Sequence, residues 1–239
     1  MDVLIDGLQN AIKLLFSLNP EILQITWLTL KISGSSTILA LLLGIPCGIL
    51  LAFYHFPGRK FILTLINTGM GLPPVVVGLF IAIILWRSGP FGFLNLMYTP
   101  IAMIIAQFVI AFPIIAGFST AAFQQVSPNV YLQAIALGAS KWQALRVIMK
   151  EVRLSALAAI MAGFGGVISE IGAVLMVGGN IKGKTRVLTT AIVLETRMGK
   201  FGMAIALSIL LLALSFSVNY LLTHIQQRGE KQWSYRSWR

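Results

Sequence analysis

Long apolar stretches separated by short polar segments make up most of the chain. A helix needs about 20 apolar residues to cross a hydrocarbon layer of about 30 Å, and five stretches reach that length, at positions 29–54, 61–86, 99–123, 154–177 and 201–225. Helices also satisfy their own backbone hydrogen bonds in lipid, where water is absent. The pattern therefore predicts an all-α integral membrane protein with about five transmembrane helices.

The first 20 residues follow a different pattern. Polar side chains recur there at helical spacing, and apolar side chains fill the opposite side up to the Asn19-Pro20 pair. A helix with two such faces lies on a membrane surface rather than crossing it. We expect one membrane domain over residues 1–239, with an interfacial helix at 1–20, a transmembrane core at 29–225 and a tail at 226–239.

Composition supports the membrane class and argues against others. Charged residues make up 10% of the chain and apolar residues 57%, whereas soluble domains carry about 25% charged residues. The net charge of +11 is not gathered in a long basic run, and no nucleic-acid-binding motif is present. The single cysteine, Cys47, allows neither an intrachain disulfide nor a zinc site. We expect no metal site and no nucleic-acid partner.

Lysine and arginine positions predict the orientation of the chain. With five spans, ten of these residues lie on one side, in segments 55–60 and 124–153 and in the tail, and eight lie on the other side. Cytoplasmic loops carry the excess of positive charge, so the N-terminus is expected outside and the C-terminus inside. Five of the eight outer cations lie in segment 180–200. Either the topology differs, or that segment is basic for a functional reason.

Residues 178–185, with the sequence GGNIKGKT, match the phosphate-loop pattern G-x-x-x-x-G-K-[ST]. The chemistry of that motif requires a strand before the loop and a helix after it, so that backbone amides surround the phosphates. Here a predicted membrane helix precedes the loop. We interpret the match as coincidental and expect no cofactor on this chain.

The segment LQAIALGASKWQALRVIMKEVR at 132–153 reads as two short helices separated at Gly138. Leu137, Trp142, Leu145 and Ile148 supply an apolar side to this predicted cytoplasmic hairpin. A hairpin between two membrane spans is explained by a partner that docks on it. The alternative is a helix that rests on the membrane surface.

This segment resembles the coupling loop of bacterial ABC importer permeases, whose pattern is roughly E-A-A-x-x-x-G-A-S followed by a basic and aromatic run. We place the loop at 128–153. Leu132 and Gln133 stand where the family has Glu and Ala, and Glu151 stands where a proline usually closes the motif. The matching residues, which the resemblance assigns to coupling with an ATPase, are Ala134, Gly138, Ala139, Ser140, Lys141 and Trp142.

Segments 71–78, 168–173, 176–181, 185–192 and 194–196 are similar to the permeases for tetrahedral oxyanions, which are molybdate, sulfate and especially tungstate. The resemblance implies the channel subunit of an ATP-driven importer that moves tungstate inward across the plasma membrane of a prokaryote. It also implies a homodimer of permeases, two cytoplasmic ATPase subunits that bind ATP-Mg, and an extracytoplasmic oxyanion-binding protein. No covalent chemistry is then expected on this chain.

Two features inside the spans are candidates for the translocation path or gate. Pro73 and Pro74 break the helix ladder within a span, which favours a kink facing the pore; a packing kink is the alternative. Glu170 is an acidic residue well inside a span, where a lone charge is costly and needs a partner. We expect a structural pair with Arg186 or another cation at the outer gate; direct gating by the Glu170 charge is the alternative.

Polar and basic residues near the outer end complete the candidate path. Lys182, Lys184 and Arg186 either raise the local concentration of an oxyanion or bind an acidic face of the binding protein. Hydroxyl and amide groups there either donate hydrogen bonds to the oxyanion or join helices together. These candidate donors are Ser169, Asn180, Thr185, Thr189 and Thr190.

Three other functions remain as rivals. A stand-alone secondary transporter or channel would act without an ATPase. An importer of molybdate or sulfate would share every feature except the cargo. A membrane enzyme needs a convergent set of catalytic groups, and Glu170 alone does not provide one.

Overall fold

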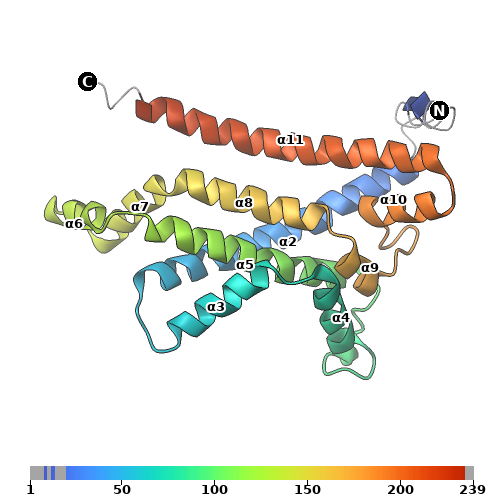
Figure 1. Cartoon of the computed structure of the whole chain (residues 1–239), viewed down its shortest axis with the longest axis horizontal. Coiled ribbons are helices and arrows are strands. Elements are labelled where there is room, and N and C mark those ends of the chain that lie inside the picture. The colour runs from blue at the N-terminus through green and yellow to red at the C-terminus, as the bar shows by residue number, and fades with distance from the viewer. Residues whose placement is uncertain (1–7, 10–11, 14–19, 235–239) are drawn as a thin grey trace.

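The computed structural model describes residues 8–9, 12–13 and 20–234, with side chains as far as residue 227. Within these residues the chain is helical and contains no strand (Figure 1). The predicted all-α class is therefore confirmed. The interfacial helix expected at 1–20 lies almost entirely outside the described residues, as does the end of the expected tail.

Three helices are long and apolar enough to cross a membrane by themselves, namely α2 (Pro20–Phe53), α5 (Pro100–Gln124) and α11 (Phe201–Ser234). The first and the last of the predicted spans are longer than expected, since α2 begins at Pro20 instead of residue 29 and α11 continues to Ser234. Proline is well suited to the first turn of a helix, and Glu21 complements the positive end of the helix dipole there. These residues explain the early start of α2.

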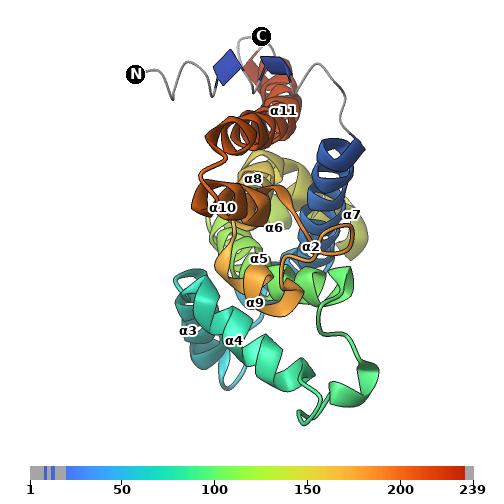
Figure 2. The same ribbon diagram turned by 90° about the vertical axis from the view of Figure 1, so that its right-hand side faces the viewer.

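Helices α2 and α5 pack against each other and, with α8 (Arg153–Ile168), form the centre of the bundle (Figure 2). Ile32 and Ala40 of α2, Met103 and Ala106 of α5 and Val167 of α8 are buried together in its core. Small residues set the spacing of α2 and α5. A Cβ atom at Gly48 would lie 2.7 Å from Cβ of Ser119, so only glycine permits this approach.

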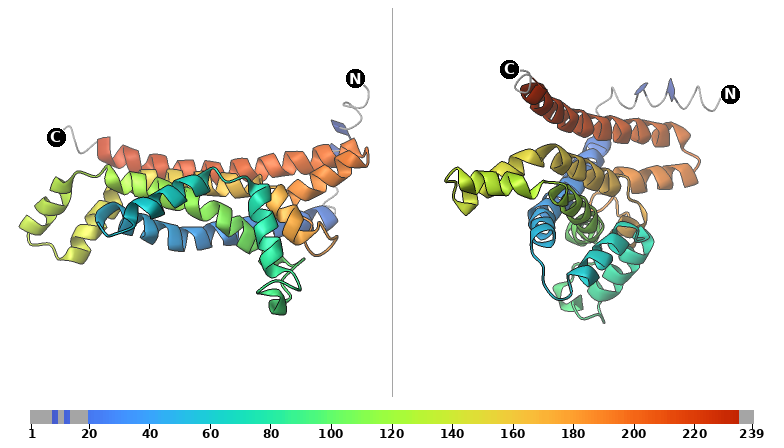
Figure 3. Two further views of the ribbon diagram at one scale, coloured as in Figure 1. Left: turned by 60° about the horizontal axis from the view of Figure 1, so that its bottom comes forward. Right: turned by 60° about the vertical axis from the view of Figure 1, so that its left-hand side comes forward.

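The second predicted span is broken rather than continuous. Helices α3 (Arg59–Met70) and α4 (Pro74–Leu85) meet at 107°, and α4 projects away from the bundle (Figure 3). A residue before proline is displaced from helical geometry, and Pro73 accordingly has φ −60° and ψ 122°. Each of the two helices has 12 residues, or about 18 Å of length, and is too short to cross alone.

The fourth predicted span is also interrupted. The 16 residues of α8 end at Ile168, and a separate short helix, α9 (Gly172–Gly178), follows the break. At its other end α8 meets α7 (Lys141–Glu151) at 62°. The described residues thus hold three candidate spans, or up to five if each bent pair crosses as one unit. The expectation of about five agrees with the upper figure.

The remaining elements gather at the two ends of the bundle. One end holds α6 (Pro128–Ala136), α7 and the C-terminal end of α11, and the other holds α9, α10 (Leu188–Arg197) and the start of α2 (Figure 1). The short helix η1 (Gly92–Leu94) lies in the loop between α4 and α5. The predicted coupling loop and the basic segment near residue 180 are therefore at opposite ends.

Two glycines of α2 allow a matched test of this packing. Gly48→Ala is expected to lower the free energy of unfolding by about 1–3 kcal/mol, because its methyl group overlaps Ser119 in a filled contact. Gly34 has no atom within 4 Å of the corresponding position, so Gly34→Ala is expected to raise stability by up to about 1 kcal/mol through helix propensity. Thermal unfolding of the detergent-purified chain measures both, and equal effects at the two sites would contradict the packing.

Candidate functional sites at the two ends of the bundle

The predicted coupling loop forms a rigid helical hairpin. Helix α6 ends at Ala136, Gly138 follows two residues later with φ +85°, and the amide of Ala139 donates to the carbonyl of Ala134 over 3.0 Å. This arrangement is a Schellman turn, in which glycine adopts the left-handed conformation at little cost. Helix α7 then starts with a capping box, since Ser140 and Gln143 each accept the other's backbone amide through their side chains. The turn residues therefore hold α6 and α7 in one fixed geometry.

The hairpin presents large apolar side chains at the end of the bundle. Leu137 is 89% exposed and Trp142 is 76% exposed. Trp142 also borders a cleft of about 690 Å³, which Tyr131 of α6 and Phe53 of α2 line as well. Exposed apolar groups of this size mark an interaction surface. Of the six predicted coupling residues, Ala134 is buried and anchors the turn, and Gly138, Ser140, Lys141 and Trp142 are exposed around it.

Near the end of the bundle that holds α9, side chains bond to backbone groups at the α8–α9 break. The carbonyl of Val167 accepts from Nε2 of Gln107 over 2.9 Å. The carbonyl of Glu170 accepts from Oγ1 of Thr189 over 3.1 Å, and Oε1 of Glu170 accepts from the amide of Ala173 over 2.9 Å. Backbone groups within a span need such partners because lipid offers none. The break is thus a built feature of the fold.

Gln107 contributes to this region, although the sequence pattern did not indicate it. It lies on α5, is buried, and joins α5 to α2 because its Oε1 accepts from Oγ of Ser36 over 3.2 Å. The available signal was an amide side chain in the apolar first half of a 25-residue helix. Such a residue must find partners within the protein.

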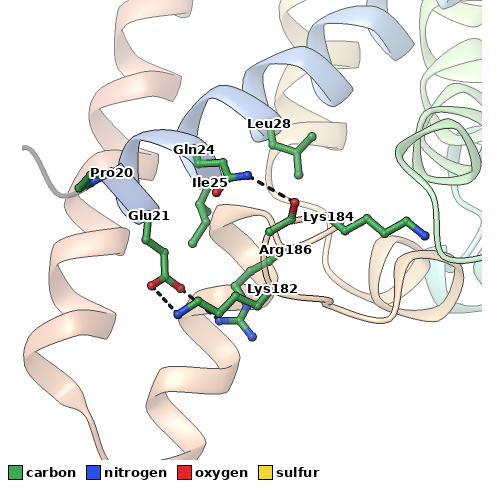
Figure 4. Close-up of a pocket in the computed structure, with 9 residues that line it drawn as sticks. Pro20, Glu21, Gln24, Ile25, Leu28, Lys182, Lys184 and Arg186 are labelled. Atoms are coloured by element: carbon green, nitrogen blue, oxygen red, sulfur yellow. Dashed lines mark hydrogen bonds and ion pairs between the residues drawn. The ribbon is translucent and has the colours of Figure 1, made fainter.

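The expected pair of Glu170 with Arg186 is wrong. The Glu170 side chain, 9% exposed, caps the start of α9 instead, and no ion pair involves it within the described part of the chain. Arg186 contacts Glu21, with 3.6 Å between Nη1 and Oε1, and Lys182 Nζ lies 2.7 Å from Oε2 of the same carboxylate (Figure 4). The early start of α2 brings Glu21 to this end, which the predicted span boundary did not allow for.

The segment that matches the phosphate-loop pattern is a closed turn preceded by helix α9. The carbonyl of Ile181 accepts from the amides of Lys184, Thr185 and Arg186, and Thr185 Oγ1 donates to the carbonyl of Gly178 over 2.6 Å. These amides point into the turn itself. The required preceding strand is replaced by a helix, so the geometry agrees with a coincidental match.

The predicted hydroxyl and amide donors are used within the fold. Each donates to a backbone carbonyl, and the threonines are buried. This placement favours the packing alternative in the present conformation, and their contact with a transported ion stays a prediction. The donor and acceptor pairs are Ser169 with Gly165, Asn180 with Thr190, Thr185 with Gly178, Thr189 with Glu170, and Thr190 with Val187.

Pro73 and Pro74 act on the same region through α4. Pro73 precedes α4 and Pro74 is its first residue. Further along α4, a Cβ atom at Gly78 would lie 2.6 Å from Cα of Ala173 in α9. The proline bend therefore directs α4 onto the short helix that follows Glu170. Whether the prolines themselves line the path remains a prediction.

Known proteins are similar to this chain in sequence and in fold. A family model for the inner membrane component of binding-protein-dependent transport systems matches residues 44–231. The tungstate uptake system permease protein TupB of Peptoclostridium acidaminophilum is 37% identical over 227 residues, covering 95% of this chain and 100% of that protein. The protein of the same name from Campylobacter jejuni is 32% identical over 95% of both chains.

A solved structure agrees with the fold. A chain of the methionine ABC transporter MetNI, in an inward-facing conformation, superimposes with a TM-score of 0.69 at 17% identity, over 87% of this chain and 95% of that chain. At this identity the likeness establishes the fold alone. Because the family model spans most of its length, this chain belongs to the inner membrane components of binding-protein-dependent transport systems.

Proposed function

We propose that this chain is the membrane subunit of an ATP-driven importer that moves tungstate inward across the cytoplasmic membrane of a prokaryote. The observation that carries the proposal is similarity over 95% of the chain to two tungstate uptake permeases. The exposed hairpin of α6 and α7 supports the dependence on a second protein. Molybdate and sulfate, which are tetrahedral oxyanions too, are the alternative cargoes.

The partners follow from the family and the two ends of the bundle. A homodimer of this chain encloses the path, and two cytoplasmic ATPases bind ATP-Mg and dock on the α6–α7 hairpins. The C-terminal end of α11 lies at the hairpin end (Figure 1), which supports a cytoplasmic C-terminus. The opposite end, with the start of α2 and the basic turn after α9, then faces the extracytoplasmic oxyanion-binding protein. ATP hydrolysis takes place on the ATPases and not on this chain.

The order of the elements suggests how ATP-driven motion reaches the ion. Helix α8 directly follows α7 and, with 16 residues, extends about 24 Å along the bundle. It ends at the break that Glu170 and Gln107 stabilise, next to α9 and α4. Movement of the hairpin therefore displaces the break, which acts as the gate between the two copies.

The role of Gln107 in positioning the break can be tested with two matched substitutions in α5. Gln107→Leu removes the donor to Val167 and is expected to destabilise the chain by about 1–2 kcal/mol and to lower tungsten uptake per membrane-inserted molecule. Gln124→Leu, at the exposed end of the same helix, is the control. Unchanged uptake and stability in Gln107→Leu would refute the positioning role.

The docking role of the hairpin is tested with Gly138→Asp. A Cβ atom at Gly138 meets nothing within 4 Å, and left-handed backbone costs about 1–2 kcal/mol for a non-glycine residue and is best tolerated by Asp and Asn. The chain should therefore insert normally. A carboxylate buried without a partner at the ATPase contact costs a few kcal/mol, and uptake is expected to fall by about tenfold or more.

Gly199→Asp is the matched control for this substitution. Gly199 has φ +70°, an equally open surrounding, and a position at the other end of the bundle, between α10 and α11. Its aspartate variant carries the same backbone strain and the same added charge. Equal loss of uptake in both variants would assign the effect to strain or charge and would reject docking at Gly138.

Elemental uptake tests the cargo and the energy source together. Cells with and without this chain receive equal traces of tungstate, molybdate and sulfate, with and without depletion of ATP. We expect a selective, ATP-dependent loss of tungsten uptake in cells that lack the chain. Loss of molybdenum or sulfur uptake instead would identify molybdate or sulfate as the cargo. Tungsten uptake that persists without ATP would favour a stand-alone secondary transporter.

A further inference from the structure

The start of α2 and the turn after α9 line an open cavity (Figure 4) at the end of the bundle opposite the α6–α7 hairpin (Figure 1). Its volume is about 180 Å³. Its polar lining consists of Glu21 and Gln24 from α2 and of Lys182, Lys184 and Arg186 from the turn. A water-sized group needs about 10–15 Å³ of such space, so the cavity accommodates the four oxygens of a tetrahedral anion.

The formal charge of the lining matches a dianion. Three cationic side chains and one carboxylate leave a surplus of +2. The Glu21 carboxylate is shared between two of the cations, at 2.7 Å from Nζ of Lys182 and 3.6 Å from Nη1 of Arg186. The Lys184 side chain extends away from Glu21 (Figure 4). Among the described lining residues, one carboxylate therefore contacts two of the three cations, and the formal charge stays positive.

Arg186 has donor capacity that Glu21 does not use. Its side chain is 15% exposed, and its buried Nε has no hydrogen-bond acceptor among the described residues. The 3.6 Å contact of Nη1 with Glu21 is longer than a hydrogen bond. A guanidinium group binds two oxygens of an oxyanion side by side, so an incoming tetrahedral anion offers Arg186 a better partner than it now has.

The turn that carries the cations is held in place without that anion. Gln24 Nε2 donates to the carbonyl of Gly183 over 3.3 Å, and the fully buried Thr185 bonds to the carbonyl of Gly178 and the amide of Ile181. The backbone that carries Lys182 and Arg186 is thus positioned by the fold. The Arg186 side chain is 15% exposed and that of Lys182 is 68% exposed, so Arg186 is the better ordered of the two. A fixed backbone lowers the entropy lost when a ligand binds.

We propose that this cavity is a binding site for a tetrahedral oxyanion dianion, in which the carboxylate of Glu21 is a resident competitor that releases Lys182 and Arg186 to the incoming ion. The choice of anion rests on the proposed function. A site along a transport route must bind its ion strongly enough to receive it and weakly enough to pass it on. The Glu21 carboxylate weakens the binding of the ion, since it contacts Lys182 and Arg186 again when the ion leaves.

Equilibrium dialysis of the purified full-length chain against tungstate tests the site, with bound tungsten measured as the element and with neither ATPase nor binding protein present. We expect Glu21→Gln to raise the affinity about tenfold and Arg186→Gln to lower it about tenfold. Lys184→Gln, which leaves the Glu21 contacts intact, is expected to lower the affinity too and provides a second reading if Arg186→Gln fails to fold. Excess sulfate should displace the tungstate, whereas chloride at equal ionic strength should not.

Glu195→Gln is the control for net charge. Glu195 lies on α10 outside the cavity lining, so the affinity should change less than twofold when its charge is removed. Equal effects of Glu21→Gln and Glu195→Gln, or wild-type affinity in Arg186→Gln and Lys184→Gln, would overturn the proposal. So would a result in which Glu21→Gln changes only the affinity for the purified binding protein, because the cations would then form a docking surface.

The two proposals fail separately. Dialysis uses no ATPase and no uptake, so a negative result there leaves ATP-dependent tungsten uptake intact. If the uptake experiment instead identifies molybdate or sulfate as the cargo, the same dialysis with that ion tests whether the cavity binds it.

Discussion

Backbone amides and carbonyls inside a membrane must bond within the protein, and the interrupted spans show how this chain meets that requirement. Lipid offers no replacement for a lost helical hydrogen bond. At the α8–α9 break, Thr189 and the Glu170 side chain supply missing partners, and Gln107 adds a second donor to the carbonyl of Val167, which also accepts from the amide of Glu170. Each comes from a different part of the sequence. The same bonds therefore satisfy the backbone and bring α5, α8 and the start of α10 together at one point.

This constraint also explains which parts of the structure were predictable. The five apolar stretches, the hairpin around Gly138 and its exposed Trp142 follow from local patterns, and the structure confirms the helices there. Family resemblance through the coupling loop agreed with the matching family model. Local patterns report helix-forming tendency and apolar length, which is why they predicted the long helices and the hairpin of α6 and α7 but not the short helices α9 and α10.

Non-local contacts were not predictable in the same way. The stretches at 61–86 and 154–177 are apolar throughout, yet both are broken, and an apolar count does not register a bend. The partner of Arg186 depended on where α2 begins, because only an early start brings Glu21 alongside the turn after α9. The role of Gln107 depends on its hydrogen bonds to Val167 and Ser36, which lie far from it in the sequence. In each case the decisive contact joins residues far apart in the chain.

The contact between α4 and α9 has a mechanical consequence. Gly78 and Ala173 lie so close together that a Cβ atom at Gly78 would overlap Cα of Ala173, and the two helices pack without a side chain between them at this point. The two helices therefore behave as one solid block. Such a block has only its attachments as joints: the turn at Pro73 on one side and the residues around Glu170 on the other. For the gate proposed at the α8–α9 break, the contact favours movement of α4 and α9 together, about the turn at Pro73 and the residues around Glu170.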